Sequence, residues 1–267
     1  MKFRFIPAAL LTVAALALTG CSPANGDSAN GTDDSLSSVL ESGTLTIGTE
    51  GTYRPFSFHE DGSGELTGYD VEVARAVAAE LGVEAVFEET QWDAIFAGLT
   101  AGRWDTIANQ VSITPERLEA YLFSAPYTYS TGVIVVPADN TSITSFASLK
   151  GMTTAQSLTS NWNTLATESG ANVEAVEGWA QSITLLEQGR VDATVNDKLT
   201  FLDYQKSNGA DNLKIAAETE ERSESAFAFA KDGTALSEAV SEALATLSDD
   251  GTLAEISDKY FGADVSQ

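Results

Sequence analysis

From residue 44 onward, short runs rich in β-branched residues alternate with longer segments in which apolar residues recur every three or four positions. Residues 44–48 have the first pattern and predict a strand. Residues 69–81 have the second pattern and predict a helix, with Asp70 as its N-cap and Gly82 just past its end. The apolar stripe of this helix consists of Val73, Val77 and Leu81. Such alternation is typical of α/β layers with a largely parallel sheet.

Two segments share a plan that indicates two lobes of similar architecture. Residues 102–109 (GRWDTIAN) and residues 189–196 (GRVDATVN) each contain a helix-ending Gly-Arg, an Asp, a strand of small and branched residues, and an Asn. Any α/β protein can use such a turn twice, so the repeat alone leaves the question open. Ligands of parallel sheets bind beyond the carboxyl ends of strands, where Asn109 and Asn196 are expected to lie.

Alternating segments at residues 131–136 and 226–230 are candidates for strands that cross between the lobes. If both cross, the second lobe is an insertion in the first, and the C-terminal helices return to the first lobe. We therefore predict that residues 44–132 and 228–267 form lobe 1 and that residues 133–227 form lobe 2, with hinge bending at the two crossings.

The N-terminal region has a pattern of its own. Two cations precede an apolar stretch, residues 5–18, which is too short to favour a membrane-spanning helix. Residues 18–21, Leu-Thr-Gly-Cys, match a lipobox. We predict a signal peptide over residues 1–20, lipidation of Cys21, and a disordered tether that occupies the rest of 21–43. The alternative, a buried cysteine, leaves the charged start and the apolar stretch without a purpose.

Composition narrows the class of function. Cys21 is the only cysteine, so its acylation leaves no disulfide and no free thiol. The formal net charge of −25 repels phosphates, which argues against nucleic acid and anionic membrane surfaces as partners. Acidity also keeps an extracellular protein soluble, so it carries no ligand information. We expect a monomer held by its lipid on the outer face of a Gram-positive type membrane, or a periplasmic protein.

Residues 114–117, Thr-Pro-Glu-Arg, begin a predicted helix with Thr114 as N-cap and Pro115 at the first helical position. Arg117 is anomalous, because a cation in the first turn opposes the helix dipole by ~0.3–1 kcal/mol. Beside Ser112 and free backbone N–H groups, its planar guanidinium would suit one wall of a carboxylate site. The alternative is a surface arginine that extends into solvent.

Five motifs follow one another with a familiar spacing. They are GTYRPFSF at 51–58, LTGYDV at 66–71, WD at 92–93, SITPER at 112–117 and FSAPY at 123–127. Together they resemble the polar amino-acid binding proteins of ABC importers, bacterial extracellular solute-binding proteins of family 3, from about residue 45 to residue 266. IANQV at 107–111 and FGADV at 261–265 are most similar to the cystine-binding branch. The resemblance implies a two-lobed periplasmic-binding-protein-like α/β fold of type II, in which each lobe has a mostly parallel sheet flanked by helices and two hinge strands join the lobes.

The resemblance also implies how the two charged ends of an amino acid are held. Arg117 would pair with the α-carboxylate, helped by Ser112 and the backbone of Gln110, and Asp197 would accept hydrogen bonds from the α-ammonium. Removing one partner of such a buried pair costs about 3–5 kcal/mol. The alternative for Asp197 is the N-cap of a helix that begins at Lys198.

Other positions would enclose the ligand side chain. Tyr53 and Trp92 fall where the family places apolar faces against it, and core packing is the alternative for each. Where many relatives have Gly-Thr-Thr, residues 158–162 read LTSNW. Ser160 could still offer its hydroxyl and helix N-terminal N–H groups, but the loop conformation is left open, and Trp162 would narrow or extend the pocket. Trp179 is interpreted as a packing residue.

We therefore expect an extracytoplasmic lipoprotein that closes over an amino acid, with cystine favoured and glutamine or histidine as alternatives, and delivers it to an ABC permease and its ATPase. No cofactor or metal is expected. One rival is a dehydratase of the same fold acting on prephenate or arogenate, but the sole histidine, His59, lies in a polar loop and no general acid stands out. The other rival is a sensor module, which would need a separate output partner.

Overall fold

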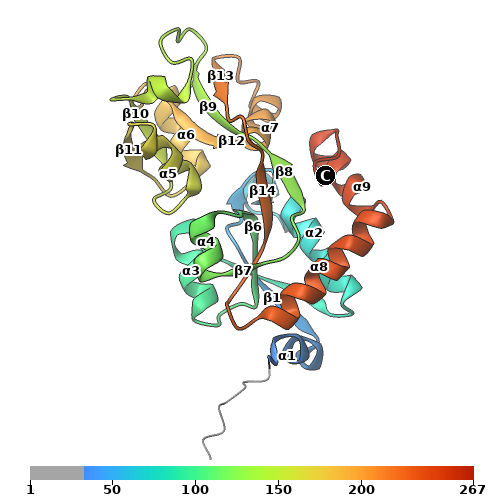
Figure 1. Cartoon of the computed structure of the whole chain (residues 1–267). Coiled ribbons are helices and arrows are strands. Elements are labelled where there is room, and N and C mark those ends of the chain that lie inside the picture. The colour runs from blue at the N-terminus through green and yellow to red at the C-terminus, as the bar shows by residue number, and fades with distance from the viewer. Residues whose placement is uncertain (1–32) are drawn as a thin grey trace, which may run out of the picture. The chain divides into compact units, whose positions relative to one another are not determined.

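The computed structural model describes residues 33–267. The predicted signal peptide, the lipidation of Cys21 and most of the predicted tether lie outside the described residues. Within them, the strands form two groups, and each group is accompanied by its own helices (Figure 1).

The sheet of lobe 1 has the order β5-β1-β6-β14-β7, with β8 also paired to β14. Its strands are β1 (Thr44–Thr49), β5 (Glu84–Glu89), β6 (Thr106–Ser112), β7 (Leu122–Phe123), β8 (Thr128–Ser130) and β14 (Ser223–Phe229). β1 runs parallel to β5 and β6, whereas β14 is antiparallel to its three neighbours. A small antiparallel sheet lies in the β1–α2 connection: β2 (Thr52–Tyr53), β3 (Ser57–His59), the 3-10 turn η1 (Glu60–Gly62) and β4 (Leu66–Thr67).

The helices of lobe 1 cover this sheet on both sides. They are α1 (Ser35–Ser42), α2 (Tyr69–Glu80), α3 (Trp92–Thr100), α4 (Pro115–Ala120), α8 (Thr234–Asp249) and α9 (Thr252–Phe261). Of the predicted stripe, Val73 and Val77 are fully buried in the core that α8 and α9 also enter, and Leu81, the residue just after α2, packs against this core partly buried. The predicted N-cap is wrong: Gly68, at φ 130°, occupies that position, and Asp70 lies inside the helix with its carboxylate buried.

Lobe 2 is built on a second mixed sheet. Its strands are β9 (Gly132–Pro137), β10 (Thr153–Gln156), β11 (Asn172–Ala175), β12 (Thr194–Asp197) and β13 (Leu213–Glu218). Antiparallel β12-β9-β13 is joined to parallel β10-β11 by a parallel bridge between Thr154 and Ala193. Its helices are η2 (Phe146–Leu149), α5 (Asn161–Glu168), α6 (Trp179–Glu187) and α7 (Lys198–Asn208).

The chain passes between the lobes at Thr131 and again at residues 219–222. At the first passage, β8 of the lobe 1 sheet ends at Ser130 and β9 of the second sheet starts at Gly132. The second predicted boundary, between residues 227 and 228, is wrong by about five residues. β14 belongs to lobe 1 from its first residue, because it pairs with β8 and β6 along its length. The C-terminal helices return to lobe 1, as expected.

The predicted tether is also too long. Residues 35–42 form helix α1, in which Val39 is buried against the lobe 1 core with Leu36 beside it. These two apolar residues, three positions apart, provide one face for packing, and Gly43 ends the helix in the left-handed conformation. Among residues 33–267, no helix has both the length and the apolar character needed to cross a membrane.

Candidate functional site

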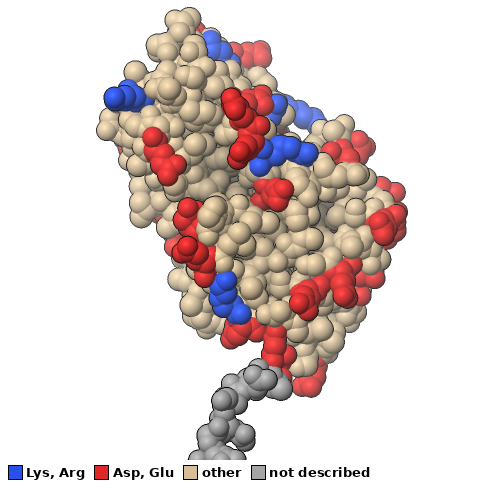
Figure 2. Space-filling view, in the orientation of Figure 1, with Lys and Arg blue, Asp and Glu red and all other residues tan. Residues whose placement is uncertain are grey.

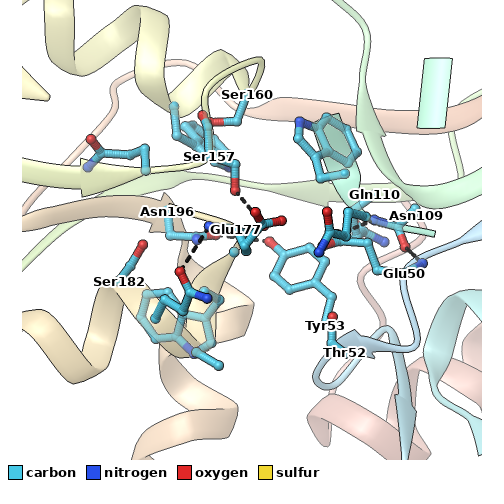
Figure 3. Close-up of a pocket in the computed structure, with 18 of the residues that line it drawn as sticks. Glu50, Thr52, Tyr53, Asn109, Gln110, Ser157, Ser160, Glu177, Ser182 and Asn196 are labelled. Atoms are coloured by element: carbon cyan, nitrogen blue, oxygen red, sulfur yellow. Dashed lines mark hydrogen bonds between the residues drawn. The ribbon is translucent and has the colours of Figure 1, made fainter. Parts of the chain in front are cut away.

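A cavity of about 460 Å³ lies between the two lobes (Figure 3). Lobe 1 contributes the segment after β1, the loop between β5 and α3, and the C-terminal half of β6. Lobe 2 contributes the ends of β10 and β12, the loop before α5 and the first turn of α6. The wall is thus formed largely where strands end, as the strand-end rule predicts, and Asn109 and Asn196 both line it.

The structure brings the eight predicted ligand-binding residues to this region in two groups. Five line the cavity: Tyr53, Trp92, Asn109, Gln110 and Ser160. The other three are buried and are not among the residues that line this cavity: Ser112, Arg117 and Asp197.

Arg117 is held inside the protein rather than in solvent. Thr114 caps α4 by accepting the N–H of Arg117, as predicted. Nη1 donates to the Ser112 carbonyl at 2.9 Å, and the guanidinium carbon lies 5.3 Å from the ring centroid of Trp92, which faces the cavity. Burial lowers the pKa of Arg117 to about 10, and its buried Nη2 has no partner within residues 33–267. A buried cation with a free donor is suited to an anion.

Asp197 provides the opposite charge. Its Oδ1 caps α7 by accepting the N–H of Leu199 at 2.8 Å, and accepts the Ser130 hydroxyl at 2.7 Å. The N-cap interpretation is therefore correct, and within the described residues both bonds use Oδ1, which leaves Oδ2 for another donor. Burial raises the pKa of Asp197 to about 6.

Paired strands bring Arg117 and Asp197 to the same region. In β14, Ser223 is paired with Ser130, the residue that binds Asp197. The Ser223 hydroxyl also donates to the Ser112 hydroxyl at 3.1 Å, and Ser112 binds Arg117 through its carbonyl. A short chain of contacts therefore connects the guanidinium of lobe 1 to the carboxylate of lobe 2.

Gln110 has an unusual backbone conformation. Its φ is +50°, the one positive φ of a non-glycine residue among residues 33–267. Asp70 holds it there, because Oδ2 accepts the Gln110 N–H and Oδ1 accepts Nε2, both at 2.7 Å. Asp70 is fully buried, which raises its pKa to about 7. The clamp fixes the direction of the backbone where β6 meets the cavity.

Two predicted residues use their side chains locally. Asn109 accepts the Glu50 N–H at 2.8 Å and donates Nδ2 to the Glu50 carboxylate at 2.6 Å. Ser160 caps α5 by accepting the N–H of Asn163 and donates to the Ser157 carbonyl. Both residues thus shape the cavity wall through bonds that are already made.

Several hydrogen bonds cross between the lobes. Tyr53 points across the cavity in Figure 3, and its hydroxyl donates to Asn196 Oδ1 at 2.9 Å. On another side, Asp93 Oδ1 accepts the N–H of Thr159 at 2.9 Å and its hydroxyl at 2.7 Å. Tyr53 also packs against the cores of both lobes. These contacts hold residues 33–267 in a closed arrangement.

Sequence reasoning did not assign most of the residues that line the wall, among them Glu50, Gln156 and Trp179, and it left Trp162 open. Trp179 was interpreted only as packing. Glu50 directly follows β1 and Gln156 ends β10, so the strand-end rule that selected Asn109 would have found both. Trp162 lines the cavity and lies against the backbone of Gly132, at the first passage between lobes.

Comparisons with known proteins identify the family of this chain. The model of the family described as bacterial extracellular solute-binding proteins, family 3, matches residues 45–263. The L-cystine-binding protein TcyA of Bacillus subtilis (strain 168) is 49% identical over 259 residues, which cover 97% of this chain and 96% of TcyA.

Two solved structures are similar to the described body. The L-cystine solute receptor of Neisseria gonorrhoeae, in its unliganded open conformation, is 46% identical with a TM-score of 0.58, covering 87% of this chain and 99% of that one. An ancestral arginine-binding protein bound to arginine is only 35% identical but has a TM-score of 0.77. The match covers 82% of this chain and 99% of that one. The predicted two-lobed α/β fold is confirmed. Similarity is higher to the liganded structure despite lower identity, in accord with a closed arrangement of lobes.

Proposed function

The chain belongs to the bacterial extracellular solute-binding proteins of family 3, and on that premise we propose that it binds L-cystine between its lobes for an ABC importer. TcyA and the Neisseria gonorrhoeae receptor, both named for cystine, support the choice of ligand. The observation that carries the proposal is the buried pair of opposite charges beside the cavity: among residues 33–267, Arg117 Nη2 has no partner and Asp197 makes its side-chain hydrogen bonds through Oδ1 alone.

In this mechanism each end of an α-amino-carboxylate group meets a different lobe. The carboxylate pairs with Arg117 and with Ser112, and the ammonium donates to Asp197 of lobe 2. Tyr53 and Trp92 enclose the apolar middle of the ligand. Because these contacts are complete only when the lobes meet, binding favours the closed arrangement.

We further propose the cellular setting that the sequence predicts. The body would be anchored outside the cytoplasmic membrane by a lipid on Cys21 and would act as a monomer. It would deliver its ligand to a permease driven by an intracellular ATPase and would catalyse no reaction. Figure 2 shows acidic side chains over both lobes on the displayed face. This charge supports the exclusion of nucleic acid as a partner.

Calorimetric titration of residues 33–267 against the twenty amino acids and cystine tests the proposal. We expect cystine to bind with a Kd of about 1 μM or tighter, equivalent to about −8 kcal/mol. The proposal fails if glutamine, histidine or arginine binds more tightly than cystine, or if only a sugar or a metal ion produces heat.

A further inference from the structure

The wall of the cavity on lobe 2 contains a second group of polar atoms, away from Arg117. Gln156 ends β10 and is only 3% exposed. Its Oε1 accepts the Thr154 hydroxyl at 2.9 Å, whereas its buried Nε2 has no partner in the part of the chain that the structure describes. A buried amide donor without an acceptor destabilises the protein, so a bound ligand that supplies an acceptor from the cavity would be favoured.

The first turn of α6 lines the cavity together with Gln156. Ser182 of this turn donates its hydroxyl to the Ala155 carbonyl at 2.9 Å, which fixes the helix start against the end of β10. The N-cap is Gly178, and no side chain caps the helix. The N–H groups of Trp179 and Ala180 therefore have no partner within the helix, and they lie at the positive end of its dipole.

Lobe 1 places a carboxylate opposite these donors. Glu50 is fixed through Oε2 by Asn109, as described above, while its Oε1 lies 3.6 Å from the position that a Cβ on Gly178 would occupy. A side chain at residue 178 would thus reduce the space between Glu50 and the start of α6. Donors and an acceptor meet at one place, and this is the pattern that a carboxylate next to an ammonium requires.

We propose that Gln156, the first turn of α6 and Glu50 form a second headgroup subsite for the far end of the ligand. The Gln156 amide and the N–H groups of Trp179 and Ala180 bind a second carboxylate, and Glu50 accepts hydrogen bonds from the neighbouring ammonium. The inference rests on the proposed function and narrows its ligand class to amino acids with an α-amino-carboxylate group at both ends. It accounts for selection of cystine over single amino acids.

A thermodynamic cycle tests the carboxylate half of this subsite. The ligands are L-cystine and the mixed disulfide of L-cysteine with cysteamine, which lacks one carboxylate only. The proteins are wild type, Gln156→Leu and Gln156→Glu, titrated by calorimetry. A hydrogen bond to a charged group contributes about 1.5–3 kcal/mol, so Gln156→Leu should weaken cystine binding about 10- to 100-fold. The Gln156→Glu variant, with a carboxylate facing a carboxylate, should weaken it further.

The mixed disulfide should bind wild type more weakly than cystine, and Gln156→Leu should then change its affinity less than about twofold. The matched control is Gln188→Leu, at the exposed far end of α6, which should leave both affinities unchanged. Equal weakening of both ligands by Gln156→Leu, or no weakening of either, would overturn the subsite. If wild type instead prefers a single amino acid to cystine, the proposed function itself has failed, and this outcome is visible before any variant is made.

Discussion

Replacing Arg117 by methionine should have opposite effects on stability and on binding. Burial lowers the pKa of the guanidinium to about 10, which is a more than hundredfold loss of proton affinity relative to an exposed guanidinium. At about 1.4 kcal/mol for each tenfold change, holding this charge in the folded protein costs about 3 kcal/mol. The hydrogen bond to Ser112 and the ring contacts offset roughly 1–2 kcal/mol of that cost. Methionine fills the same apolar space, so Arg117→Met should stabilise the protein in the absence of ligand by about 1 kcal/mol, or about 2–4 °C in Tm.

The same change removes the partner of the ligand carboxylate. Loss of one member of a buried ion pair costs about 3–5 kcal/mol, so the Kd for cystine should rise by roughly two to three orders of magnitude. Thermal unfolding without ligand and calorimetry with cystine measure the two effects. Arg103→Met is the matched control, since Arg103 also lies over an indole ring, at 5.2 Å, but is exposed, and both effects should be small. A lower Tm for Arg117→Met without ligand, or an unchanged Kd, would refute the reasoning.

Three further outcomes are expected. The pKa of Asp197, raised to about 6 by burial, means that the folded state holds this proton more tightly than the unfolded chain. Its contribution to stability is therefore full below about pH 4 and is lost as the pH rises through 6. Cystine affinity should fall as the pH drops below 6, and calorimetry across pH should show a shallower fall for Asp197→Asn, in which Glu50, with its pKa raised to about 7 by burial, still loses its charge. Tyr53→Phe removes the hydroxyl bond to Asn196 and should speed ligand release about tenfold or less with little change in association, as measured by stopped flow. Gly68 has a φ of 130°, and a Cβ there would clash with the backbone of Phe56, so Gly68→Ala should reduce the free energy of unfolding by about 3 kcal/mol or more. Gly82 has a φ of 76° with open space around it, so Gly82→Ala should cost only about 1 kcal/mol. Denaturant unfolding measures both.

Local patterns predicted the elements well, and non-local contacts explain the errors. The strand at 44–48 and the helix at 69–81 are β1 and α2, and the caps at Thr114 and Asp197 are where their sequence neighbours indicate. Asp70 has the local pattern of an N-cap, but its partner is Gln110, forty residues away, and no window of sequence contains both.

The second lobe boundary was wrong for a similar reason. Residues on both sides of the passage at 219–222 have strand character, so their pattern does not show which sheet they join. Only the pairing of Ser223 with β8 and of Ser225 with β6 assigns β14 to lobe 1. Glu50 follows β1 and Gln156 ends β10, but neither residue belongs to a motif of the family resemblance, so only the positions of the strand ends indicate them.

The distribution of buried charge connects ligand choice to lobe closure. Arg117 belongs to lobe 1 and Asp197 to lobe 2. Burial lowers the pKa of Arg117 and raises the pKa of Asp197, so it disfavours the charged form of both side chains. A simple carboxylate ion can pair only with Arg117 of lobe 1. It should therefore bind the open and closed arrangements with similar affinity and not favour closure. A ligand that also carries an ammonium gains its second ion pair only on closure, and a differential affinity of this kind is what shifts a two-state equilibrium. Acetate should therefore compete weakly with cystine and leave the lobes open. Small-angle X-ray scattering should then give a larger radius of gyration for the protein with acetate than for the protein with cystine.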